Sequence, residues 1–207
     1  MTSQATMEKL PAGDRDPVVV VPHAQSGMPT ALVGMLLFIA SEVMFFGGLF
    51  ATYFNARASE AGHWGPPAGG HLDVPLAAVL TAILVASSFT MQFGVWAIRR
   101  GDQGKLRLWT AITLGLGILF LAGQLYDYSQ LGFSIADDTF GTTFYTLTGF
   151  HGAHVFGGVI GLTVVLARAM RGQFSGRNHV AVEAVSMYWH FVDVVWIFVF
   201  STIYLLR

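Results

Sequence analysis

The sequence predicts an all-α membrane protein whose fold is a bundle of five transmembrane helices. Three observations support this fold class. Hydrophobic residues make up 54% of the 207 residues and charged residues only 11%, whereas a soluble domain of ordinary composition is about 25% charged. Five apolar stretches each reach the roughly 20 residues that a helix needs to cross a bilayer. None of them shows the period-2 alternation of a membrane β-barrel strand.

A helix is the required conformation because backbone groups in lipid must be hydrogen-bonded within the segment. We expect the spans at about 30–54, 75–98, 108–128, 140–167 and 180–206. Residues 1–28 are polar and lack the apolar stretch of a signal peptide. We therefore expect them to form a cytoplasmic tail before a single membrane domain at 29–207.

The distribution of basic residues predicts the direction of the bundle. On one side would lie Lys9, Arg15, Arg99, Arg100, Lys105, Arg107, Arg168, Arg171 and Arg177. Only Arg57 and Arg207 would lie on the other side. The positive-inside rule then places the N-terminus in the cytoplasm and the C-terminus outside.

Charge and cysteine usage exclude several classes of function. The net charge of −1 leaves no strongly basic surface to hold a nucleic acid. With no cysteine, the chain has no disulfide, thiolate nucleophile or iron–sulfur ligand. We find no phosphate-binding loop, nucleotide-binding glycine motif or serine triad.

Glu42 lies near the middle of the first span, flanked by Phe38, Phe45 and Phe46. An ionisable residue at this depth is costly and usually faces protein, water or another polar group. Two interpretations stay open: a structural carboxyl, protonated or hydrogen-bonded between helices, and a proton-relay or lipid-contact carboxyl. A hydrophobic carbodiimide, which attacks protonated carboxyls, should modify Glu42 in preference to Glu8, Glu60 and Glu183.

The last span carries a polar stripe. Its members are Glu183, Ser186, His190 and Asp193. Their spacing of i, i+3, i+7 and i+10 places them on one helix face. This stripe predicts a hydrogen-bonded ladder inside the bundle, and we favour interhelical bonding over a separate proton path. Gln124 and Asp127 add polar groups near the outer end of the third span.

The fourth span has a small residue at every fourth position, namely Gly149, Ala153, Gly157 and Gly161. This repeat predicts a seam at which a neighbouring helix approaches closely. His151 and His154 lie beside it. They have no third metal ligand nearby in sequence, and a haem would need an opposing ligand such as His190. Core histidines with satisfied hydrogen bonds are favoured, and no metal ligand is assigned.

Three long segments resemble subunit III of the haem–copper oxidases. Residues 188–206 (YWHFVDVVWIFVFSTIYLL) are similar to its last helix, and residues 139–158 (TFGTTFYTLTGFHGAHVFGG) to the preceding helix. Residues 36–54 (LLFIASEVMFFGGLFATYF) resemble the helix that carries its carbodiimide-reactive glutamate. The resemblance covers about residues 34–206 and fits the five-helix bacterial form of this subunit.

The resemblance implies a non-catalytic core subunit of a proton-pumping cytochrome c oxidase of the aa3 type, used in aerobic respiration in a bacterial plasma membrane. It implies no redox centre in this chain, with haem and copper in partner subunits. The chain would stabilise the catalytic subunit I, support proton uptake and bind phospholipid in a cleft beside its first helix. Subunits I and II are the implied partners; a small subunit IV and a respiratory supercomplex are further candidates.

The resemblance also suggests roles for single residues. Glu42 matches the reactive glutamate, Glu183 the glutamate that opens the last helix, and Arg168 a basic residue at a lipid headgroup. The positions with an implied structural role are His151, His154, His190 and Asp193. Asp127 stands where many relatives carry Glu, so its charge is kept.

Three alternatives stay open at this point. Subunit III of a quinol oxidase has the same architecture, because the electron-donor site lies on other subunits. A small transporter or channel gated by Glu42 would need a water-lined path through this chain. A membrane cytochrome using His190 would show a haem absorption band.

Overall fold

The computed structural model describes residues 28–60, 62 and 64–206, so the predicted tail lies, apart from Met28, outside the described residues. The described elements are α1 (Thr30–Ser59), α2 (Val74–Arg99), α3 (Gln103–Gln130), α4 (Thr139–Met170), α5 (Val180–Phe200) and a π-helical turn, η1 (Ser201–Leu205). All five α-helices are long and apolar enough to cross a membrane, and the described part of the chain contains no strand. The predicted all-α class with five helices of membrane-spanning length is therefore confirmed.

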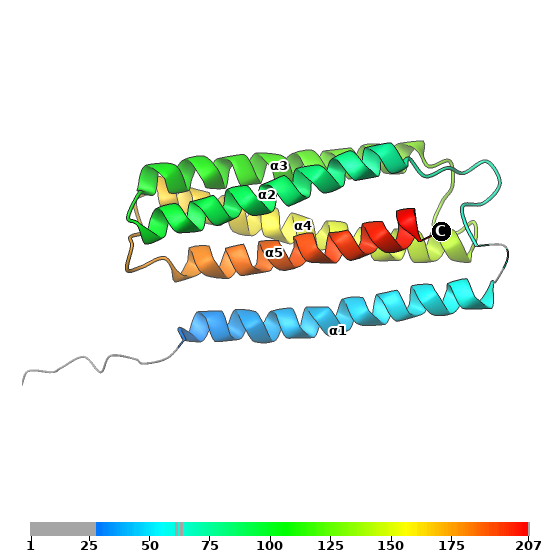
Figure 1. Cartoon of the computed structure of the whole chain (residues 1–207), viewed down its shortest axis with the longest axis horizontal. Helices are drawn as coiled ribbons and strands as arrows, with labels where there is room; N and C mark the ends of the chain where they lie inside the picture. Colours follow the sequence, from blue (N-terminus) through cyan, green and yellow to red (C-terminus); the bar gives the residue numbers. More distant parts are fainter. Residues whose placement is uncertain (1–27, 61, 63, 207) are drawn as a thin grey trace, which may run out of the picture.

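Helices α2 to α5 form an antiparallel four-helix unit, and α1 lies along one side of it (Figure 1). Within the unit, α2 and α4 each pack against both α3 and α5. Helix α1 contacts α4 and α5, and its only buried side chains are Phe46 and Tyr53. The first helix is therefore held to the rest of the bundle through one narrow face.

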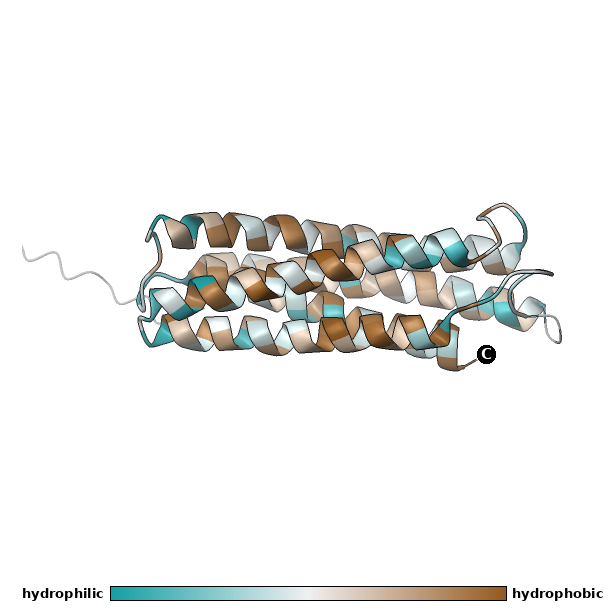
Figure 2. Ribbon diagram, turned by 90° about the horizontal axis from the view of Figure 1, so that it is seen from above, coloured by the Kyte–Doolittle hydropathy of each residue, from teal (hydrophilic) through white to brown (hydrophobic). Residues whose placement is uncertain are grey.

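The outer surface of the helices is apolar. In Figure 2, hydrophobic colouring follows the helix bodies and hydrophilic colouring gathers at the loops and helix ends. Met44 is 79% exposed and Leu125 68% exposed, and many other large apolar side chains of the helices are also exposed. Soluble monomers rarely expose so much apolar surface. These features support a multi-pass membrane protein. Which end of the bundle faces the cytoplasm stays a prediction.

The helices extend beyond the predicted apolar stretches. Helix α3 begins at Gln103 rather than near 108, because the Asp102 carboxylate accepts a 2.9 Å hydrogen bond from the backbone N–H of Lys105 and caps the helix. Lys105, which we expected in a loop, thus lies in the first turn of α3. Helix α1 continues to Ser59 rather than 54. Gly101, with φ of +80°, makes the tight turn between α2 and α3.

Two helices of the four-helix unit pack tightly against the buried indole of Trp189. A Cβ atom added at Gly117 of α3 or Gly158 of α4 would lie 2.6 Å from a carbon of this ring. The predicted seam is wrong at Gly149, where an added Cβ would meet no atom within 4 Å. At two other members of the seam, Gly157 and Gly161, an added Cβ would lie 3.3 Å from the Tyr188 hydroxyl and 3.5 Å from Val185, so α5 does approach the seam there. The approach is closer at Gly158, which the seam did not include, because this position receives the large Trp189 side chain.

Candidate functional site

Helix α1 joins the four-helix unit through Glu42. Its Oε2 atom lies 2.9 Å from Nε2 of His154 on α4. The Glu42 side chain is 18% exposed and the His154 side chain 16% exposed, so protein atoms shield most of this contact. Two residues that the sequence singled out separately, 112 positions apart, therefore meet at membrane depth.

The hydrogen bonds of His154 restrict where its protons lie. Nδ1 is 2.7 Å from the carbonyl oxygen of Phe150, and a carbonyl only accepts, so Nδ1 carries a proton. In a neutral ring Nε2 is then an acceptor, and its contact with a carboxyl oxygen needs one further proton. Either Glu42 is a carboxylic acid that donates to Nε2, or an imidazolium donates to the carboxylate. The two side chains thus share one exchangeable proton.

Aromatic rings enclose this pair. The ring centroid of Phe46 lies 4.9 Å from that of His154, and Phe45 lies 6.0 Å from it. Phe45 also packs edge-on against Phe150 at 5.1 Å. On the α5 side, the Tyr188 hydroxyl donates a 3.0 Å hydrogen bond to the carbonyl oxygen of His154. In such low-dielectric surroundings a hydrogen bond is strengthened and an unpaired charge is costly.

An apolar groove of about 500 Å³ runs between α1 and the second half of α5 with η1. Its lining includes Phe46, Phe50, Phe54, Phe191, Val195 and Phe198. Phe46 belongs to both the groove and the aromatic shield of His154. The groove therefore begins beside the Glu42–His154 pair and leads toward the end of the bundle that holds η1.

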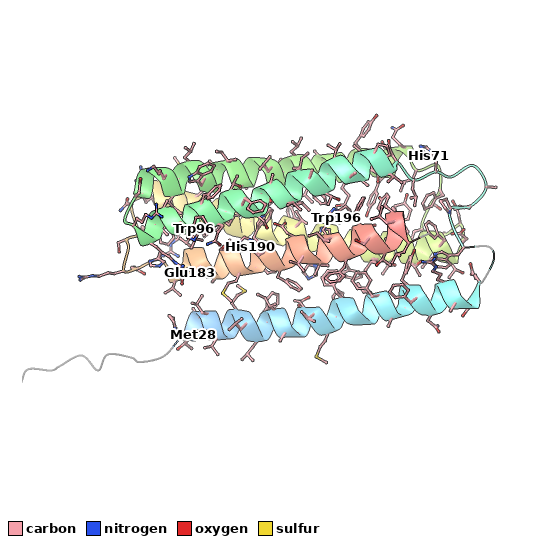
Figure 3. All side chains as sticks on the ribbon, viewed as in Figure 1. Met28, His71, Trp96, Glu183, His190 and Trp196 are labelled. Atoms are coloured by element: carbon pink, nitrogen blue, oxygen red, sulfur yellow. The ribbon has the colours of Figure 1, made fainter. Side chains whose placement is uncertain are left out.

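The polar stripe of α5 faces α2. Nε and Nη2 of Arg99 donate to Oε1 of Glu183 at 2.9 and 2.7 Å. Deeper in the bundle, the Ser88 hydroxyl donates to Oδ2 of Asp193 and lies 3.0 Å from Nδ1 of His190. A hydroxyl has one proton, so Nδ1 of His190 is the donor in the second bond. Figure 3 shows Glu183 and His190 along α5.

A second polar cluster lies near the opposite end of the bundle. The Tyr204 hydroxyl donates to Oδ2 of Asp127 at 3.2 Å. Nε2 of Gln124 donates to the carbonyl oxygen of Thr148 at 3.1 Å, and the hydroxyls of Tyr128 and Thr148 are 2.7 Å apart. These bonds connect α3 to α4 and to the π-helical turn.

His151 differs from the other histidines in the spans. It is fully buried, with its ring 4.8 Å from Trp196 and edge-on to Phe120 at 5.8 Å. Neither ring nitrogen has a hydrogen-bond partner in the described part of the chain. The expectation of a satisfied core histidine is therefore wrong here, because aromatic packing occupies the space. The Trp196 N–H is donated instead to Thr81, at 2.9 Å.

Arg168 lies in the last turn of α4. Its guanidinium carbon is 4.8 Å from the centroid of Phe174, and its Nε donates to Oε1 of Gln173 at 3.0 Å. Both contacts hold the side chain against the α4–α5 connection, and neither neutralises its charge. A lipid phosphate as its partner stays a proposal.

The arrangement of the histidines does not support a haem between His190 and His154. Nε2 of His154 faces Glu42 on α1, whereas Nδ1 of His190 faces Ser88 on α2. Among the residues with described positions, no group of three or more His, Asp or Glu side chains could hold a metal ion.

Sequence reasoning missed the partners of several polar residues. Ser88 joins His190 and Asp193, and Ser87 accepts a 2.9 Å hydrogen bond from the Trp189 indole. Two adjacent serines in an apolar span were the available signal, because hydroxyls at membrane depth often bond to another helix. No comparable signal marked Tyr204 as the partner of an aspartate.

Comparison with known proteins gives a consistent result. The family model described as cytochrome c oxidase subunit III matches residues 19–207, beginning within the predicted tail. The chain is 49% identical over 178 residues to the probable cytochrome c oxidase subunit 3 of Nocardia farcinica, covering 84% of this chain and 87% of the relative. It is 46% identical over 179 residues to the cytochrome c oxidase subunit 3 of Corynebacterium diphtheriae, covering 84% of this chain and 87% of the relative. It is 39% identical over 189 residues to the cytochrome c oxidase subunit 3 of Thermostichus vulcanus, covering 91% of this chain and 93% of the relative.

Proposed function

The chain belongs to the cytochrome c oxidase subunit III family, and we propose that it is a non-catalytic membrane subunit of a proton-pumping terminal oxidase. Family membership confirms the resemblance seen in the helix sequences. In this proposal the chain joins subunits I and II, which hold the haem and copper of an aa3-type enzyme. The relatives are bacterial cytochrome c oxidase subunits, which favours a bacterial plasma membrane and cytochrome c, rather than quinol, as electron donor.

The Glu42–His154 pair is the observation that carries the proposed role in proton uptake. Its two forms are a neutral acid with a neutral imidazole, and a carboxylate with an imidazolium. Separated charges are expensive in a low-dielectric interior, so we assign the neutral form to the resting state. In the neutral form the carboxyl keeps its proton, and a protonated carboxyl is the form that a carbodiimide attacks.

The groove beside α1 is the proposed site for phospholipid acyl chains. Its volume of about 500 Å³ and its almost wholly apolar lining suit hydrocarbon rather than a polar solute. The groove lies in the half of the bundle away from Arg168. An acyl chain held there therefore belongs to a different lipid from the one that we propose for the Arg168 guanidinium.

The test of this function uses Glu42→Ala in an oxidase purified through a tag on this chain. Initial O2 reduction should persist, because the proposed catalytic metals lie in other subunits. The variant should inactivate after fewer turnovers or pump fewer protons per electron, because the shared proton is lost. Prolonged oxygen-electrode recordings and proton release from liposomes measure these effects. A hydrophobic carbodiimide should label Glu42 in the unmodified enzyme, with Glu60 and Glu183 as internal controls.

Three results would contradict the proposal. One is a tagged chain that purifies without a haem- and copper-bearing partner. Another is immediate and complete loss of O2 consumption in a fully assembled Glu42→Ala complex. The third is carbodiimide label found mainly on Glu60, which lies at the end of α1.

A further inference from the structure

A second cavity lies at the turn between α2 and α3. Its volume is about 380 Å³. The residues that matter in its lining are Phe93, Trp96, Arg100, Asp102, Lys105 and Trp109. Figure 3 shows Trp96 near the end of α2, at the same end of the bundle as Glu183. Helix α1 packs on α4 and α5, so this cavity is separate from the groove described above.

The aromatic side of the cavity offers two uncommitted hydrogen-bond donors. Of the five tryptophans, Trp64, Trp189 and Trp196 donate their indole N–H to hydroxyl groups of the protein. Trp96 and Trp109 are the remaining two, and neither has such a partner within residues 28–60, 62 and 64–206. Tryptophan at a membrane boundary usually packs its ring on hydrocarbon and directs its N–H to a polar group.

The ring packing gives this side a fixed shape. Phe93 lies between the two indoles, 5.7 Å from Trp96 and 5.1 Å from Trp109 between ring centroids. Phe93 is 39% exposed and Trp96 46% exposed. The three rings therefore form a continuous apolar floor of the cavity on the outer surface of α2 and α3.

The charged residues of the cavity lining are Arg100, Lys105 and Asp102. Arg100 is exposed and has no ion pair in the part of the chain that the structure describes, whereas the adjacent Arg99 is paired with Glu183. Nζ of Lys105 lies 3.1 Å from Oδ2 of Asp102. The backbone N–H of Lys105 also donates to Asp102 and, with the Lys105 side chain, lowers the pKa of that carboxyl. Asp102 thus competes with any external anion for Lys105.

The two parts of the lining match the two ends of one kind of ligand. A soluble anion would use the basic residues and leave the aromatic floor without a role. An apolar molecule would give Arg100 and the two indole N–H donors nothing to bind. A phospholipid would use both parts of the lining. Its phosphate would lie at the turn, beside Arg100, and its acyl chains would lie along the helices, beside the aromatic rings.

We propose that the α2–α3 turn binds one anionic phospholipid, whose phosphate contacts Arg100 and the indole N–H groups and whose acyl chains pack on Phe93, Trp96 and Trp109. Arginine suits this role because its planar guanidinium donates two parallel bonds to a phosphate. The site uses no residue of the Glu42–His154 pair, so its test is independent of the proposed function.

The test uses the full-length chain in mild detergent and two photoactivatable lipids with a diazirine in the acyl chain. Phosphatidylglycerol should label peptides containing Trp96 or Trp109 more strongly than the matched phosphatidylcholine does, as measured by peptide mass spectrometry. Arg100→Gln should lower this labelling about fivefold, the factor expected for one basic residue at an anionic surface. Arg100→Lys should lower it less, since the charge stays.

Asp102→Asn provides the opposite arm. Asparagine still caps α3 but releases Lys105, so labelling by phosphatidylglycerol should rise. Arg171→Gln, which removes an exposed charge just after α4, is the matched control and should change nothing at this site. The proposal is overturned by equal labelling with both lipids, by even labelling over all helices, by no change in Arg100→Gln, or by a loss in Asp102→Asn.

Discussion

Replacing Gly158 by alanine should destabilise the helix bundle, because the new methyl group would collide with Trp189. The added Cβ would lie 2.6 Å from Cε3 and 2.7 Å from Cζ3 of the indole, whereas carbon atoms in contact prefer about 3.5–4.0 Å. The ring would have to move by about 1 Å to restore that separation. It cannot move toward α3, because Gly117 already meets its other edge.

The expected cost is the overpacking penalty of about 1–3 kcal/mol. Moving the ring would also weaken the 2.9 Å hydrogen bond from the Trp189 N–H to Ser87. A hydrogen bond between side chains of two membrane helices contributes about 0.6 kcal/mol of stability on average. Gly149→Ala, on the same helix, is the control. Its added Cβ meets no atom within 4 Å, so its free energy of unfolding should change by less than about 1 kcal/mol.

The assay is unfolding of the full-length chain in mixed micelles as SDS is added, followed by far-UV circular dichroism. A double-mutant cycle with Trp189→Phe sharpens the test, since phenylalanine lacks the ring atoms that collide with the new methyl group. Gly158→Ala should then cost less, with a coupling of about 1 kcal/mol or more. Equal stabilities of Gly158→Ala and Gly149→Ala would refute the packing argument.

Two further predictions concern the ends of the bundle. Glu183→Gln should cost only about 0.2–1 kcal/mol, because Arg99 is 52% exposed, and a double-mutant cycle with Arg99→Gln should show coupling that fades with added salt. Hydrogen bonds from the Ser134 N–H and hydroxyl lower the pKa of Asp137 below its ordinary value of 3.8. Their stabilisation is complete above that value and disappears as pH falls through the lowered pKa. Unfolding at pH 5 and pH 3 should therefore show a smaller acid loss in Asp137→Asn; an equal loss would contradict this assignment.

The number and approximate extent of the helices could be predicted from sequence because both follow from local chemistry. A run of about 20 apolar residues must become a helix in lipid, whichever neighbours it acquires. The ends were less accurate. Helix α3 gained a turn through the Asp102 cap and α1 a turn beyond 54, since polar residues past the hydrocarbon can stay helical once their backbone groups have partners.

The composition of the candidate site was only partly predictable. The depth of Glu42 and the spacing of the α5 stripe are visible in the sequence, because depth follows from position within an apolar run and spacing from helical period. Their partners are not visible. Ser88 stands out only as a hydroxyl in an apolar span. The sequence does not distinguish His154 from His151, although of these two only His154 meets a carboxyl.

Local composition and helical period therefore specify the set of helices and, on each helix, which face carries polar or small residues. They do not specify which faces meet, because helix packing depends on the shapes of side chains from distant segments. That is why Gly158, and not Gly149, receives Trp189. It is also why one proton comes to be shared between α1 and α4, through residues 112 positions apart.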